Sequence, residues 1–190
     1  YIGYEKILEG QSYLSELSGK SKKGESLLDP IRVLKDFNNK LGSAYINFGD
    51  PIDLGSFLRE RVSESELKEN TLNEKPEWLK KATTNLGESI IKGINSSVAV
   101  TSTSLFSISL LTDSTQSLSE DKLKGRINMY LDLIKNSKTY SHVWLTNTNP
   151  SEIIDKTVEL KLIKSQLVGN SKIFKPTNDE TSILSFYKNN

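Results

Sequence analysis

Apolar residues recur every three or four positions in four stretches of the chain, a spacing typical of helices with one buried face. Asp29-Pro30 supplies a cap and a first-turn proline for one of them, and Ser117–Glu120 and Asn149–Glu152 are capping sequences for two others. We therefore predict four long helices, whose apolar positions are Leu27, Ile31, Leu34, Phe37 and Leu41; Trp78, Leu79, Ala82, Leu86, Ile90, Ile91 and Ile94; Leu123, Ile127, Tyr130, Leu131 and Ile134; and Ile153, Ile154, Val158 and Leu162. The second of these helical stretches extends from Glu77 to Val100.

Shorter elements are predicted between these helices. Short helices are expected from about Gln11 and after Asp53, which can cap a turn through Phe57 and Leu58. Runs rich in β-branched and aromatic residues predict strands at both sides of the 27–41 helix and near the end of the chain. These runs are 1–6, 44–52, 166–168, 172–174 and 183–187, and Gly169-Asn170-Ser171 joins two of them in a small hairpin.

The most apolar segment extends from Val98 to Leu111, and nearly half of it is serine and threonine. It is shorter than the ~18 apolar residues that a membrane-spanning helix needs. A helix resting at a membrane interface would need a basic polar face, which this segment lacks. We therefore predict a helix buried in the protein.

Composition changes between Ser63 and Lys75, where the chain is charged and has few apolar residues besides Leu67 and Leu72. Such a segment is typical of a domain boundary. We predict an α/β layer over residues 1–60, a linker over 61–76 and a mainly α domain over 77–190, with a small β hairpin near the end. Because the chain begins inside a predicted strand and without methionine, we expect it to be a piece of a larger protein.

Charge and cysteine content exclude several classes of function. The 190 residues carry 25 Lys and Arg against 24 Asp and Glu, so the formal net charge of +1 gives no long-range field for nucleic acid. With no cysteine, the chain has no disulfides, thiol chemistry or cysteine-rich metal sites. The charges of Lys80-Lys81 and Asp121-Lys122 are interpreted as solvated helix faces.

Several short motifs occur in a characteristic order along nearly the whole chain. Together the set resembles the bacterial membrane-bound sn-glycerol-3-phosphate 1-O-acyltransferase, from the last motif block of its acyltransferase domain onward. The motifs are Tyr1-Ile2-Gly3-Tyr4-Glu5, Glu9-Gly10, Lys22-Lys23-Gly24-Glu25-Ser26-Leu27, Tyr45-Ile46-Asn47-Phe48-Gly49-Asp50-Pro51-Ile52, Pro76-Glu77-Trp78-Leu79, the 95–111 segment, Tyr130-Leu131-Asp132-Leu133 and Phe186-Tyr187-Lys188-Asn189-Asn190.

The resemblance implies that residues 1–60 complete an acyltransferase α/β domain. It also implies transfer of a fatty acyl group from acyl-CoA or acyl carrier protein to the sn-1 hydroxyl of glycerol 3-phosphate. The product would be lysophosphatidic acid, and the reaction the first step of phospholipid biosynthesis, at the cytoplasmic face of the bacterial inner membrane. The expected partners are these two substrates and the membrane phospholipid surface, with no cofactor and no nucleic acid. The alternative is a non-catalytic helical module that binds a protein partner or a membrane surface.

The family's general base is a histidine in the pattern H-x-x-x-x-D, where the aspartate orients the ring. The single histidine here is His142, and the residue five positions on is Asn147. The pattern is therefore absent. We predict no catalytic residue and no metal ligand in this chain, which should be inactive alone.

The resemblance places substrate-binding residues at Gly3, Tyr4 and Glu5. Gly3 would let the backbone approach a ligand, and Tyr4 and Glu5 could hydrogen-bond glycerol hydroxyls or neighbouring basic groups. The structural alternative is a buried strand with Glu5 paired at its end. Lys22 and Lys23, beside Lys20, could bind a substrate phosphate, but a solvated basic loop also explains them and is the favoured interpretation. Asn47, Gly49 and Asp50 are interpreted as a structural turn.

Overall fold

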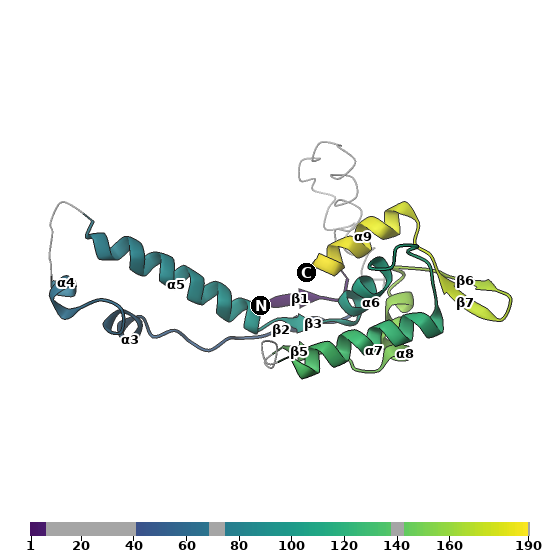
Figure 1. Ribbon diagram of the computed structural model, residues 1–190, viewed down its shortest axis with the longest axis horizontal. Coiled ribbons are helices and arrows are strands. Elements are labelled where there is room, and N and C mark those ends of the chain that lie inside the picture. Colours follow the sequence, from purple (N-terminus) through teal and green to yellow (C-terminus); the bar gives the residue numbers. More distant parts are fainter. Residues whose placement is uncertain (7–40, 69–74, 138–142, 190) are drawn as a thin grey trace, which may run out of the picture. The chain divides into compact units, whose positions relative to one another are not determined.

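The computed structural model describes residues 1–6, 41–68, 75–137 and 143–189 (Figure 1). The helices predicted near Gln11 and over 27–41, the lysines Lys20, Lys22 and Lys23, and His142 lie outside the described residues, apart from Leu41. Two compact units are present: residues 47–98 with Tyr1, and residues 2–46 with 99–190. The predicted division into 1–60, 61–76 and 77–190 rests on sequence composition and stays a prediction.

The first unit is helical. It holds α3 (Leu54–Arg59), α4 (Glu64–Lys68) and α5 (Glu77–Ser96). Asp53 caps α3 as predicted, because its Oδ1 accepts a hydrogen bond from the Ser56 N–H at 3.0 Å. Phe57, Val62 and Ala82 are buried, and the Arg61 guanidinium lies 4.1 Å from the centre of the Phe57 ring.

Helix α5 ends earlier than its apolar pattern predicts. The pattern extends to Val100, but the helix stops at Ser96, and Ala99–Val100 form strand β3. The backbone N–H groups there serve a strand pair instead of the helix. Four of the periodic apolar residues, Leu79, Ile90, Ile91 and Ile94, are exposed in this unit. The pattern therefore identified the helix but not its buried face.

The described residues of the second unit form three small sheets. Strands β1 (Ile2–Tyr4) and β2 (Ala44–Ile46) pair antiparallel with Gly3 opposite Tyr45, so both predicted strands form, each shorter than its run. Strand β3 pairs in parallel with β5 (Trp144–Leu145). The third sheet has the order β4-β7-β6, from β4 (Leu118–Ser119), β7 (Ser171–Phe174) and β6 (Ser165–Val168). Its β6–β7 part is the predicted hairpin.

The core of this unit is built around α6 (Ser102–Leu111), which confirms the helix predicted as buried within 98–111. The helix packs against α7 (Glu120–Asn136), α8 (Pro150–Glu159) and α9 (Asn178–Asn189), and Figure 1 shows it enclosed by them. Since α6 is apolar or small on every side, each of its faces needs a covering element. The buried apolar residues of this core are Leu105, Phe106, Leu110, Leu111, Leu118, Leu123, Ile127, Leu131, Ile153, Ile154, Leu160, Leu162, Ile163, Phe174, Leu184 and Tyr187.

Capping sequences set the starts of these helices. Asn149 caps α8 as predicted: its Oδ1 accepts from the Ser151 N–H at 3.0 Å, and its Nδ2 donates to Glu152 at 3.0 Å. For α7 the predicted cap was Ser117, and this is wrong. The helix begins at Glu120 with Ser119 at the N-cap, because Leu118 and Ser119 pair with Phe174 and Ile173 of β7.

The β-prone run 183–187 is helical, which corrects our prediction of a strand. A capping box opens α9: the Thr177 N–H donates to Glu180 at 2.8 Å, and the Glu180 N–H donates to the Thr177 hydroxyl at 3.3 Å. Leu184 and Tyr187, three positions apart, are buried on one face of the helix. The cap and this helical spacing outweigh the β propensity of Ile183 and Phe186.

Phe106 should be a sensitive position for stability. It is fully buried, and its ring packs edge-on against that of Phe174, with centroids 5.7 Å apart. We expect Phe106→Ala to lower the free energy of unfolding by about 3–5 kcal/mol because it leaves a cavity. Urea unfolding followed by circular dichroism measures this. Leu167→Ala, at a side chain that is 75% exposed, is the control and should change stability by less than about 0.5 kcal/mol. Equal effects of the two variants would contradict this core.

Candidate functional site

Strand β1 carries Gly3 and Tyr4, and Glu5 follows directly after it; the resemblance assigns these three residues to substrate binding. Successive residues of an extended chain face opposite sides, so the side chain of Tyr4 is turned away from that of Glu5. Tyr4 is 53% exposed, whereas Gly3 is buried and Glu5 is only 2% exposed. The three residues therefore lie together on the chain, but only Tyr4 presents its side chain to solvent.

The Glu5 carboxylate is held by partners on both oxygens. Oε2 accepts from the Ser43 N–H at 2.9 Å and lies 3.7 Å from the Lys156 ammonium, and Oε1 accepts from the Tyr45 hydroxyl at 3.1 Å. Burying a carboxylate is costly unless such partners compensate for lost water. This is the pairing that the structural alternative predicts for Glu5, and it includes the basic group expected beside it. A role of Gly3, Tyr4 and Glu5 in substrate binding stays a prediction.

Two further features stabilise this end of the β1–β2 pair: a hydrogen bond to the residue that follows α8, and a glycine beside Glu5. The Lys6 ammonium donates to the Leu160 carbonyl, just after α8, at 2.9 Å. Gly42 has a φ of +74°, and a Cβ placed there would lie 2.8 Å from the Glu5 Cβ and 2.7 Å from Oε2. Position 42 therefore requires glycine for two reasons, which are its left-handed backbone conformation and the space that Glu5 occupies.

An open groove follows helix α7, and we call it the α7 groove. Its first part has a volume of about 480 Å³ and lies between the turn 113–117 and the first turns of α7. Its polar lining is Asp113, Ser114, Thr115, Ser117, Lys122 and Arg126. The second part, of about 840 Å³, is open and follows the helix from Gly125 to Ser137. Gly125 and Met129 line both parts, so the two parts adjoin at these residues.

The polar end of the α7 groove is ordered by an ion pair. Arg126 Nη2 lies 2.6 Å from Asp113 Oδ2, and Asp113 Oδ1 accepts from the Thr115 hydroxyl and from its N–H at 2.9 Å. The Thr115 hydroxyl and then its N–H lower the pKa of Asp113, and the charges of Arg126 and Lys122 lower it further. Asp113 therefore stays ionised and keeps Arg126 in place.

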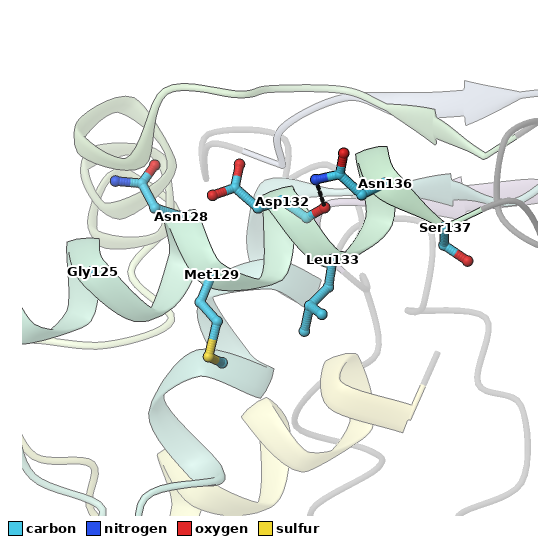
Figure 2. A pocket seen from close by; sticks show the side chains of 7 residues that line it. All are labelled: Gly125, Asn128, Met129, Asp132, Leu133, Asn136 and Ser137. Carbon is cyan, nitrogen blue, oxygen red and sulfur yellow. Dashed lines mark hydrogen bonds between the residues drawn. The ribbon is translucent and has the colours of Figure 1, made fainter.

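The apolar part of the groove has two distinct flanks. In Figure 2, Met129 and Leu133 point to one side of α7 together with Ser137, whereas Asn128, Asp132 and Asn136 point to the other. The sequence signal for this groove was the spacing of Lys122, Arg126, Met129 and Leu133 at i, i+4, i+7 and i+11. Asp121 and Lys122 are exposed, as predicted for a solvated helix face, but the sequence analysis did not identify the groove beside them.

Two features are absent from the described residues. Across 1–6, 41–68, 75–137 and 143–189, histidine and carboxylate side chains do not gather in groups of three that could hold a metal ion. In the same part of the chain, helices long and apolar enough to cross a membrane are absent.

Comparisons with known proteins give one consistent result. The family model described as "Glycerol-3-phosphate acyltransferase C-terminal region" matches residues 13–190. Proteins named glycerol-3-phosphate acyltransferase from Pseudomonas putida strain GB-1 and Pseudomonas fluorescens strain SBW25 are each 32% identical to this chain over 190 residues. The protein of that name from Ectopseudomonas mendocina strain ymp is 30% identical over 190 residues. Each alignment covers 100% of this chain and 23% of the relative, so the chain spans about a quarter of their length.

Two glycines with positive φ allow a test of the Glu5 site. Gly42→Ala and Gly169→Ala both place a side chain in the left-handed region, at a φ of +74° and +59°, but only Gly42 has atoms within 4 Å of the added Cβ. We expect Gly169→Ala to cost about 1 kcal/mol of unfolding free energy and Gly42→Ala clearly more, because Glu5 must move as well. Urea unfolding of both variants measures the difference. Equal costs would show that Glu5 does not occupy the space beside Gly42.

The lowered pKa of Asp113 predicts a pH dependence. A carboxylate whose pKa is lower in the folded than in the unfolded protein adds stability above its unfolded value of about 3.9. That contribution disappears as the pH falls through the folded pKa. The difference in unfolding free energy between the wild type and Asp113→Asn should therefore be largest near pH 6–7 and shrink below about pH 4. Asp155→Asn, on the exposed side of α8, is the matched control. A difference that stays constant with pH would contradict the Asp113 interactions.

Proposed function

The chain belongs to the family described as the glycerol-3-phosphate acyltransferase C-terminal region, and on this premise we propose that it is the C-terminal part of a bacterial glycerol-3-phosphate 1-O-acyltransferase. The observation that supports the proposal most is the continuous match. It covers residues 13–190, and the relatives align with the whole chain. The alignments with the relatives thus span both the Tyr1–Glu5 segment and the helical C-terminal region.

The proposed reaction joins a fatty acyl group to the sn-1 hydroxyl of glycerol 3-phosphate. The hydroxyl oxygen attacks the carbonyl carbon of an acyl-CoA or acyl carrier protein thioester. An ester bond forms, the carbon–sulfur bond breaks, and the hydroxyl proton ends on the leaving thiol. A histidine–aspartate pair in the pattern H-x-x-x-x-D would act as the base. Since the chain lacks this pattern, we place the pair in a region preceding Tyr1 and expect the chain alone to be inactive.

Residues of this chain would then support the substrate site. Tyr4 is the member of the motif block whose side chain is accessible for a hydrogen bond to a glycerol hydroxyl, since it is half exposed. Buried Gly3 and Glu5 would act by holding β1 in place, Glu5 through Ser43, Tyr45 and Lys156. Lys22 and Lys23 are proposed to attract the phosphate of glycerol 3-phosphate or of the thioester donor.

The setting follows from the reaction. The product, lysophosphatidic acid, enters phospholipid biosynthesis and partitions into lipid. We therefore propose that the protein works at the membrane phospholipid surface, at the cytoplasmic face of the bacterial inner membrane.

The full product of the gene that encodes this chain tests the proposed function. Membranes of cells that express it should convert labelled glycerol 3-phosphate and palmitoyl-CoA into lysophosphatidic acid, because they contain both the base and the substrate site. The 190-residue chain, expressed alone, is the control and should give none. A full product with neither turnover nor an H-x-x-x-x-D pair would favour the non-catalytic binding module instead.

A further inference from the structure

Four residues of the α7 groove lie in one line along the helix. Lys122, Arg126, Met129 and Leu133 follow at i, i+4, i+7 and i+11, which places them within an arc of about 60° on a helix of 3.6 residues per turn. The first two are cations and the last two are apolar. The line therefore changes from charged to apolar in one direction along α7.

The charged end is suited to a phosphate. Lys122 and Arg126 contribute two positive charges, and Asp113, which is paired with Arg126 at 2.6 Å, contributes one negative charge. The net charge of the three is +1. Ser114 and Ser117 add hydroxyls to the same lining. Cations combined with hydroxyl donors bind phosphate oxygens through charge-assisted hydrogen bonds.

The apolar end is suited to an extended hydrocarbon chain. From Gly125 to Ser137 the helix rises about 18 Å, comparable to a long acyl chain. Met129 and Leu133 are exposed along this length, and methionine adapts to chains of different shape. The missing side chain of Gly125, which lies in both parts of the groove, leaves the passage between the charged and apolar ends open.

We propose that the α7 groove binds a single-chain lipid with a phosphate monoester headgroup, its phosphate at Lys122 and Arg126 and its chain along Met129 and Leu133. This deepens the proposed function and rests on it, since lysophosphatidic acid has this chemistry. A free fatty acid would place one carboxylate against two cations and the serine hydroxyls, and glycerol 3-phosphate has no chain for the apolar end. Both are poorer matches to the line of residues on α7.

Direct binding to the 190-residue chain tests this site. The probe is 1-lauroyl glycerol 3-phosphate below its micelle concentration, titrated by calorimetry. We expect saturable binding that Lys122→Ala weakens about tenfold, through the lost charged hydrogen bond, and that Leu133→Asp weakens at least as much. Both side chains are exposed, Leu133 to 60%, so the fold should be kept, and circular dichroism checks this. Lys135→Ala on α7 and Leu167→Asp on β6 are the matched controls and should bind like the wild type.

Three results would overturn the site. They are equal binding of lauroyl lysophosphatidylcholine or of lauric acid, equal weakening by the two control variants, and the absence of saturable binding. Because the titration needs no turnover, any of them would leave the acyltransferase proposal standing. A full gene product without acyltransferase activity would, conversely, remove the proposed function while the lipid titration could still succeed.

Discussion

The second unit depends on one constraint, which is that α6 has no polar face. Ser102, Thr103, Ser107 and Ser109 are buried together with its leucines and Phe106. A helix without a solvated side must be enclosed, and α7, α8 and α9 supply the enclosure. The serines also contribute through their size, since small side chains allow neighbouring helices to approach closely. Among the described residues, the hydroxyls of Ser107 and Ser109 are buried without a hydrogen-bond partner, a cost that the enclosure of α6 must offset.

The same constraint produces the α7 groove. Leu123, Ile127 and Leu131 are turned to the core, which leaves the line from Lys122 to Leu133 on another side of the helix. Arg126 connects the α7 groove to α6. Its guanidinium contacts the Ser109 carbonyl at 3.5 Å and the Thr112 hydroxyl at 3.4 Å, at the C-terminal end of α6. A cation there is favoured by the carbonyls that a helix end leaves unpaired. Thus the residue that contacts the end of α6 also contributes one of the two cations of the groove.

What the sequence predicts well is set by local interactions. The Asn149–Glu152 cap, the 166–174 hairpin and the buried 98–111 helix depend on residues close together in the chain, and all three form. The prediction of a strand over 183–187 was wrong for a local reason too. The Thr177–Glu180 capping box indicates the start of a helix, and the β propensity of the run was given more weight. The faces of α5 and α7 could not be assigned in this way. Their apolar spacing is the same whether a neighbouring element covers them or not.

The sequence analysis considered a paired Glu5, but the partners of Glu5 could not be predicted, for a different physical reason. Its partners Ser43, Tyr45 and Lys156 lie far away in the chain, and propensity or periodicity gives no measure of such pairings. The consequence reaches the proposed function. A buried carboxylate in the motif block is compensated in part by an ammonium on α8, so the geometry of that block depends on a helix of the C-terminal region. The two regions are therefore coupled through one ion pair and its hydrogen bonds.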